Sequence, residues 1–138
     1  MTLKELSQLY YLNREIERDK KRLEELRLKS CSLSGSSITG VPGGGSFDGS
    51  NIDRYISEIV DLEAIISAKV TQCLHERNRL ERYIADIPDS LTRQIFTLRF
   101  INGLSWEQCA AHIGYGNTWK NLSNICYRYI EKSNRNEI

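Results

Sequence analysis

The chain has 138 residues, 40% of them hydrophobic, and a formal net charge of +1 at pH 7. This length and composition suit one domain or two small ones with a hydrophobic core, and the near-neutral charge argues against a protein that holds nucleic acid through phosphate contacts alone. No apolar run approaches a membrane span and Met1–Glu5 lacks the apolar centre of a signal peptide, so we expect a cytoplasmic protein.

The amino-terminal half predicts two long helices that pair as an antiparallel coiled-coil hairpin. In the second helix, steps of four and three residues join mostly apolar positions: Ile52, Ile56, Ile59, Glu63, Ile66, Val70, Cys73, Arg77, Leu80, Ile84 and Ile87. A weaker stripe in the first helix runs through Leu6, Leu9, Asn13, Ile16, Lys20, Leu23 and Leu26. Residues 30–51 between them hold Ser or Gly at 13 of 22 positions, which predicts a flexible loop.

Pairing these two stripes predicts a register for the hairpin. Leu9 would face Cys73, and Lys20 would face Glu63 as an opposite-charge pair that fixes the alignment. Three apolar residues of the second stripe then lie beyond the start of the first helix and must pack on the carboxy-terminal segment or on another chain: Leu80, Ile84 and Ile87.

We expect a second chain to cover at least part of that surface, so the protein is predicted to be a homodimer, or a four-helix arrangement of two hairpins. Apolar side chains off the seam support this expectation, because a two-helix hairpin leaves them exposed. They are Tyr10, Tyr11, Tyr55, Leu62 and Ile65.

Three shorter helices are predicted from Pro88 onward. Pro88 cannot continue a preceding helix, and Asp89 and Ser90 are free to cap the next one. That helix should bury Leu91, Ile95, Leu98 and Ile101 and end at Asn102-Gly103. A shorter helix should begin after its cap Ser105 and end at Gly114, with these inner positions: Trp106, Cys109, Ala110 and Ile113.

The last helix, at about residues 118–132, carries the candidate binding residues. Its inner side is predicted to hold Trp119, Leu122, Ile125 or Cys126, and Tyr129, and its outer side Lys120, Asn121, Asn124 and Arg128. Asn can pair with adenine, and Lys or Arg with guanine or phosphate. Asn117 and Thr118 at the amino end could donate to a phosphate beside backbone N–H groups, and further phosphate contacts are expected from Arg99, Ser105 and Trp106.

The carboxy-terminal segment resembles region 4 of sigma-70-type transcription factors. The resemblance is carried by Ile87-Pro88, Leu98-Arg99-Phe100, Gly103-Leu104-Ser105, Ala110 and Ile113-Gly114. With its helical amino-terminal half, the whole chain resembles phage-encoded regulators of the ArpU and RinA type, which carry a glycine-rich segment, here Gly40–Gly44, ahead of a helix that includes Ile59–Glu63.

The resemblance implies an all-α protein with a coiled-coil hairpin at 1–87 and a helix-turn-helix domain at 88–138. It further implies a transcriptional regulator of phage or prophage genes that binds double-stranded promoter DNA and touches RNA polymerase. One departure is that the family places apolar residues where counting from Gly114 reaches Lys120 and Ser123. Here the stripe falls on Trp119 and Leu122, so either the turn is one residue shorter or the last helix is rotated.

No catalytic or cofactor-binding pattern stands out. Cys109 and His112 lie three residues apart, with Cys73 and His75 elsewhere, but no Cys-x-x-Cys pair exists, so we expect thiols and neither metal nor cofactor. We therefore predict a protein that is not an enzyme. Two other functions remain open: a DNA-packaging factor resembling a small terminase subunit, which would form a ring, and a coiled-coil interaction scaffold that does not bind DNA.

Overall fold

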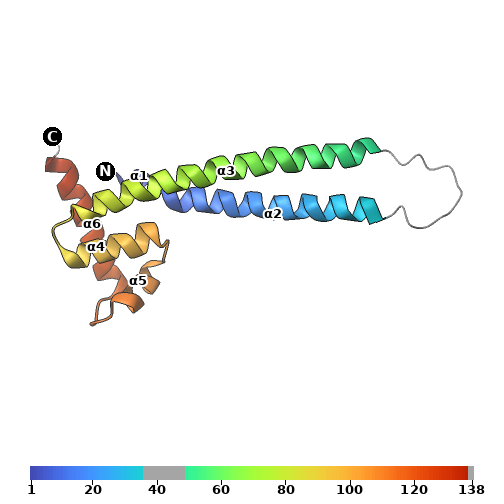
Figure 1. Ribbon diagram of the computed structural model, residues 1–138. Helices are drawn as coiled ribbons and strands as arrows, with labels where there is room; N and C mark the ends of the chain where they lie inside the picture. The colour runs from blue at the N-terminus through green and yellow to red at the C-terminus, as the bar shows by residue number, and fades with distance from the viewer. Residues whose placement is uncertain (36–48, 137–138) are drawn as a thin grey trace, which may run out of the picture. The chain divides into compact units, whose positions relative to one another are not determined.

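The computed structural model describes residues 1–35 and 49–136, and in these two stretches every regular element is a helix (Figure 1). The predicted all-α class is therefore confirmed for this part of the chain. The elements in chain order are α1 (Leu3–Leu6), α2 (Gln8–Gly35), α3 (Gly49–Ala85), α4 (Ser90–Phe96), the π-helical turn η2 (Thr97–Ile101), α5 (Trp106–Ile113) and α6 (Trp119–Asn136).

The link between the long helices is shorter than the loop predicted at residues 30–51. α2 continues to Gly35 and α3 begins at Gly49, because a long helix adds a hydrogen bond for each further residue and so carries Ser and Gly at its ends. The glycine-rich run Gly40–Gly44 lies outside the described residues. Within the stretches that are described, no helix is both long and apolar enough to span a lipid bilayer.

Residue contacts divide the chain into two compact units. One, the hairpin unit, comprises Arg14–Thr71, and the other, the terminal unit, combines Met1–Asn13 with Gln72–Ile138. The contacts therefore do not divide the chain at residue 87, where the sequence suggested a boundary. The start of α2 and the end of α3 belong to the unit that contains the short helices.

In the hairpin unit, α2 and α3 run side by side in opposite directions, so the predicted antiparallel hairpin is confirmed (Figure 1). Apolar side chains from both helices are buried between them: Ile16, Leu23 and Leu26 from α2, and Leu62 and Ile66 from α3. The Nζ of Lys69 lies 2.6 Å from Oδ2 of Asp19 and 3.5 Å from Oε2 of Glu15. These contacts join the two helices across one edge of the seam.

The predicted register of the hairpin is wrong. Glu63 binds Arg27 at 2.7 Å, and Lys20, its predicted partner, is exposed. In the terminal unit the Cys73 thiol donates to Oδ1 of Asn13 at 3.6 Å, whereas the sequence placed Cys73 opposite Leu9. The partner of Cys73 thus lies four residues further along α2 than predicted, which is about one helical turn.

The predicted seam positions are also partly wrong. Leu62, predicted to be exposed, and Lys69 lie in the seam, so Glu63 and Val70 one residue later are exposed. Other members of the predicted α3 stripe are buried or half-buried as expected, among them Ile59, Ile66 and Cys73.

The terminal unit has its own hydrophobic core, built from both ends of the chain. Leu6 and Leu9 pack there with Leu80, Ile84 and Ile87, the three residues that were expected to pack on the carboxy-terminal segment or on another chain. These three are only 0%, 5% and 1% exposed, so the chain's own carboxy-terminal segment covers them, and only the expectation that a second chain covers part of them is wrong. The short helices complete the core with Ile95, Phe96, Phe100, Cys109, Leu122, Cys126 and Ile130.

The segment after Pro88 begins its helix as predicted. Asp89 caps α4, since its Oδ2 accepts from the backbone N–H of Thr92 at 2.9 Å and from the Thr92 hydroxyl at 2.7 Å. Of the predicted inner stripe, Ile95 is fully buried and Leu91, Leu98 and Ile101 are half-buried.

Phe96 and Phe100, which the predicted stripe omitted, lie deeper in the core than most of it. η2 contains a wide turn in which the N–H of Asn102 donates to the carbonyl of Thr97 at 3.0 Å. This turn departs from the regular helical spacing on which the stripe was based. Phe96 packs edge-on against Phe100 and Tyr129, with ring centroids 5.3 and 5.6 Å away.

Candidate nucleic-acid interface

The second of the short helices is held at both ends by the residues that the sequence singled out. Ser105 forms a capping box with Gln108, in which the Ser105 hydroxyl accepts from the Gln108 N–H at 3.2 Å and the Gln108 side chain accepts from the Ser105 N–H at 2.9 Å. At the other end Gly114 has a φ of +66°, a conformation that costs glycine little. α5 therefore begins and ends as predicted.

A tight turn of three residues with positive φ joins α5 to α6. Its members are Gly114, Tyr115 at φ 54° and Gly116 at φ +71°. Tyr115 adopts this conformation although it is not glycine. Its side chain is fully exposed, so packing in the core does not hold it in this conformation. Asn117 closes the turn, because its side-chain Nδ2 donates to the carbonyl of Gly114 at 3.0 Å.

The amino end of α6 is organised by Thr118 and two asparagines. The Thr118 hydroxyl oxygen accepts from the backbone N–H of Asn121 at 3.2 Å, which is the geometry of an N-cap. The Asn121 side chain donates to Oδ1 of Asn117 at 3.3 Å. The two predicted phosphate-binding residues therefore support the turn and the helix start, and the N–H groups of the first helical turn lie beside them.

Four of the predicted base- and phosphate-binding residues lie together on one exposed face of α6. They are Lys120, Asn121, Asn124 and Arg128. The opposite side of the helix is buried through Leu122, Cys126 and Ile130. The candidate face is thus polar, carries two positive charges and lies in the first ten residues of the helix.

The rotation of α6 resolves the question that the sequence left open. Ser123 is only 7% exposed and its hydroxyl donates to the carbonyl of Lys120 at 2.9 Å, whereas Trp119 is 44% exposed. Counting directly from Gly114 had placed inner positions at Lys120 and Ser123, and it is correct for Ser123 but wrong for Lys120, which is exposed. Leu122, from the alternative stripe, is fully buried. The prediction that Trp119 lies on the inner stripe is wrong, because this first residue of the helix lies largely outside the core.

The three residues expected to make further phosphate contacts are already engaged within the chain. Arg99 donates from a terminal nitrogen to the carbonyl of Leu104 at 2.8 Å, and its guanidinium carbon lies 5.0 Å from the centre of the Trp106 ring. Ser105 caps α5. Phosphate contacts by these residues stay a prediction, and any such contact would have to coexist with these internal roles.

Sequence reasoning missed Tyr127, which borders the candidate face. Its side chain is 42% exposed, and its ring packs edge-on against Trp106 with centroids 6.1 Å apart. Helical spacing alone could have found it, because Tyr127 lies three residues after Asn124 and just before Arg128. The contact links the exposed side of α6 to the first residue of α5.

The two cysteines of the terminal core are packing residues. Burial raises the pKa of the Cys126 thiol to about 12 and also raises that of Cys109. Both thiols therefore stay protonated near neutral pH, which makes them poor nucleophiles and metal ligands. Among the described residues, no three His, Cys, Asp or Glu side chains come together as a metal site.

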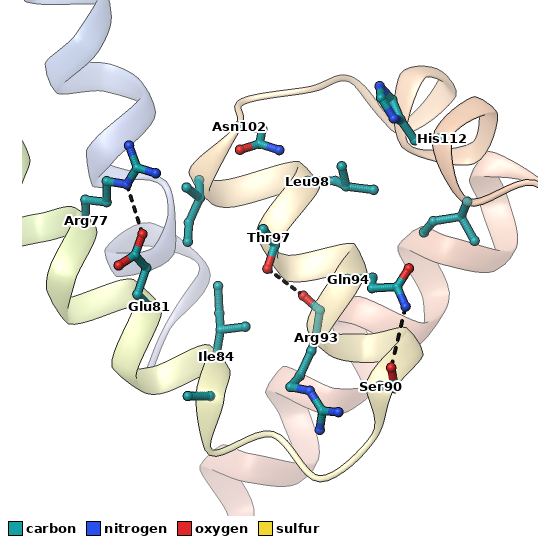
Figure 2. Close-up of a pocket in the computed structure, with 13 residues that line it drawn as sticks. Arg77, Glu81, Ile84, Ser90, Arg93, Gln94, Thr97, Leu98, Asn102 and His112 are labelled. Atoms are coloured by element: carbon teal, nitrogen blue, oxygen red, sulfur yellow. Dashed lines mark hydrogen bonds and ion pairs between the residues drawn. The ribbon is translucent and has the colours of Figure 1, made fainter.

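A separate cleft of about 610 Å³ opens in the terminal unit between the end of α3 and the short helices (Figure 2). α3, α4, η2 and α5 supply its lining. Arg77 and Glu81 form an ion pair of 2.9 Å at its rim, and Arg93 donates to the carbonyls of Ile87 and Pro88. The cleft therefore lies apart from the candidate face of α6.

Comparison with protein-family models, with curated proteins and with solved structures found no match to this chain.

Proposed function

We propose that the protein is a sequence-specific DNA-binding regulator of phage or prophage transcription that reads promoter DNA with α6. One observation carries the proposal: α6 follows α5 through a tight turn and exposes Lys120, Asn121, Asn124 and Arg128 on a single face. A helix presented after such a turn is the element that helix-turn-helix proteins insert into the major groove. The resemblance to sigma-70 region 4 supports the same assignment.

Charge adds a condition to this proposal. From residue 88 onward the chain has 6 basic and 4 acidic residues, so one copy neutralises few phosphates. We infer that the protein acts as a homodimer, in which two recognition helices bind paired half-sites, or with RNA polymerase at its side. Its location in the cytoplasm follows from this function and belongs to the same proposal.

Binding to DNA selected from a random-sequence pool tests the proposal. Lys120→Ala and Arg128→Ala should each weaken binding and lower the slope of log affinity against log salt by about one, since each removes one cationic contact. Asn124→Ala should instead reduce the preference for the selected sequence over random DNA. Fluorescence anisotropy over a range of salt concentrations measures both effects.

Matched controls come from the hairpin unit. Lys20→Ala and Arg18→Ala remove the same charges from exposed positions of α2 and should leave affinity and salt slope close to those of the unchanged protein. Asn121→Ala is less informative, because it also removes the bond to Asn117. Equal effects of the α6 and α2 changes, or no effect of any, would contradict the proposal.

A further inference from the structure

α3 carries more apolar surface than α2 covers. Leu62 and Ile66 are 8% and 9% exposed in the hairpin seam. Four other aliphatic side chains of the same helix remain about half exposed: Ile56 at 49%, Val60 at 57%, Val70 at 48% and Leu74 at 57%. Aliphatic side chains gathered on one helical face at this exposure mark a surface that another protein covers.

These four residues belong to a second stripe with coiled-coil spacing. The stripe runs along one continuous helix with alternating steps of four and three residues, through Ile56, Val60, Glu63, Ser67, Val70 and Leu74. This spacing lets a second helix pack along the stripe. It differs from the seam toward α2, in which Leu62 and Ile66 lie.

The order of chemical types in the stripe is the same from either end. Two aliphatic residues come first, then the polar pair Glu63 and Ser67, then two aliphatic residues again. A surface with this order matches a copy of itself turned end to end. Twofold interfaces between identical chains require such self-complementarity.

We propose that a second copy of this chain packs its α3 antiparallel against this stripe. The symmetry places Ile56 opposite Leu74 of the partner subunit and Val60 opposite Val70 of the partner subunit. Glu63 faces Ser67 of the partner subunit, so no two like charges meet at the centre. We assign this surface to a second copy of the chain because the stripe, read in the opposite direction, complements itself.

Charges just outside the aliphatic residues agree with this pairing. The next stripe positions outward are Asp53 and Arg77. The same symmetry places Asp53 opposite Arg77 of the partner subunit, and Arg77 opposite Asp53 of the partner subunit. Arg77 binds Glu81 of its own chain through Nε at 2.9 Å, and its guanidinium has four further N–H donors. A shift of the pairing by one turn would lose this match of opposite charges.

Small uncharged side chains border the stripe on the side away from α2. Ser57, Ala64 and Thr71 follow each other at intervals of seven residues. None of these three side chains carries a charge, so two α3 helices can approach closely along this side, and Glu63 at the centre keeps its ion pair with Arg27 of its own chain. The inference specifies the pairing surface of the homodimer proposed above, and its test uses no DNA, so it can fail while DNA binding stands.

Sedimentation of the full chain tests the surface. The unchanged protein should be a dimer at tens of micromolar, and Val70→Glu should raise the dissociation constant by about 100-fold or more, since each dimer would bury two unpaired carboxylates. Ile65→Glu is the matched control, because Ile65 is 49% exposed on the same helix but lies off the stripe. It should leave the dimer intact.

Circular dichroism of both variants checks that each remains helical. A monomeric unchanged protein, a ring of many copies, or equal effects of Val70→Glu and Ile65→Glu would overturn the proposal. If Val70→Glu unfolds the chain, the disulfide experiment below decides alone.

Disulfide formation tests the direction of the pairing. In a background with Cys31→Ser and Cys73→Ser, an equal mixture of Val60→Cys and Val70→Cys proteins should form mixed disulfide dimers. Val60→Cys alone should not, because its two copies would lie about 15 Å apart along the helix axis. Efficient bridging of Val60→Cys alone would indicate parallel helices and overturn the proposed arrangement.

Discussion

Single polar side chains determine where the short helices of the terminal unit begin. Asp89 is the clearest case, since its carboxylate accepts from both the hydroxyl and the backbone N–H of Thr92. These two bonds hold the pKa of Asp89 below its ordinary value of 3.8, and the bond from the Thr92 hydroxyl has the larger effect. The cap therefore stabilises α4 above that pH, and its contribution is lost as the pH falls through the lower pKa of the folded protein.

The first prediction follows from this cap. Asp89→Ala should lower the midpoint of urea unfolding at pH 6, and the difference from the unchanged protein should shrink below pH 3.8, the ordinary value. Asp86→Ala serves as the control, because Asp86 is exposed and precedes the cap. A difference that stays constant down to pH 3 would show that the charge of Asp89 does not stabilise the helix.

At the scale of helices, the pairing of α2 with α3 depends on which of two adjacent residues faces inward. Leu12 is 8% exposed, whereas its neighbour Asn13, which the sequence placed in the seam, is exposed. The same alternative arises at Leu62 and Glu63 in α3. A change of one residue in the seam turns a different set of side chains toward solvent.

Alanine substitution at these neighbours gives the second prediction. Leu12→Ala should lower the free energy of unfolding by about 2–4 kcal/mol, since it removes a buried aliphatic side chain. Asn13→Ala should cost roughly 0.5 kcal/mol or less, since it removes an exposed amide and one weak bond from a thiol. If Asn13→Ala destabilised the protein more than Leu12→Ala in thermal or urea unfolding, the register expected from the sequence would be favoured.

The elements of this fold were predictable where a local signal decides them. Asp89, Ser105 and Gly114 fix helix ends through bonds and backbone angles within a few residues, and the structure confirms all three. The polar face of α6 was predictable for the same reason, because periodicity separates Lys120 and Asn124 from the buried Leu122.

The register was not predictable, because it depends on contacts between distant residues. α3 has aliphatic residues on two adjoining sides, and periodicity alone does not show which side α2 covers. Trp119 was misassigned for a related reason, because an apolar residue in the first turn of a helix can extend past the core.

At the scale of the whole molecule, the candidate DNA-binding helix shares its core with the first residues of the chain. Leu6 is completely buried in the cluster that contains Leu122 and Cys126 of α6. The short helices are therefore not an independent unit that begins at residue 88. Their stability depends on residues more than one hundred positions earlier.

The third prediction tests this dependence in the full chain. Leu6→Ala should lower the free energy of unfolding of the terminal unit by about 2–5 kcal/mol, as for other fully buried leucines. Fluorescence reports on that unit directly, because the two tryptophans of the chain are Trp106 and Trp119. Leu3→Ala is the control, at a position 43% exposed. An unchanged fluorescence transition in Leu6→Ala would show that the short helices do not depend on the amino-terminal segment.

The shared core also determines when the short helices can fold during biosynthesis. A ribosome adds about 5–20 residues per second, so the segment around Leu6 leaves the exit tunnel on the order of 10 s before the residues of α6 that it will contact. The helices α2 and α3 can pair during that interval, whereas α6 gains its support only after its own residues have left the tunnel. Nascent chains that end before α6 should therefore be unable to show the DNA binding proposed above.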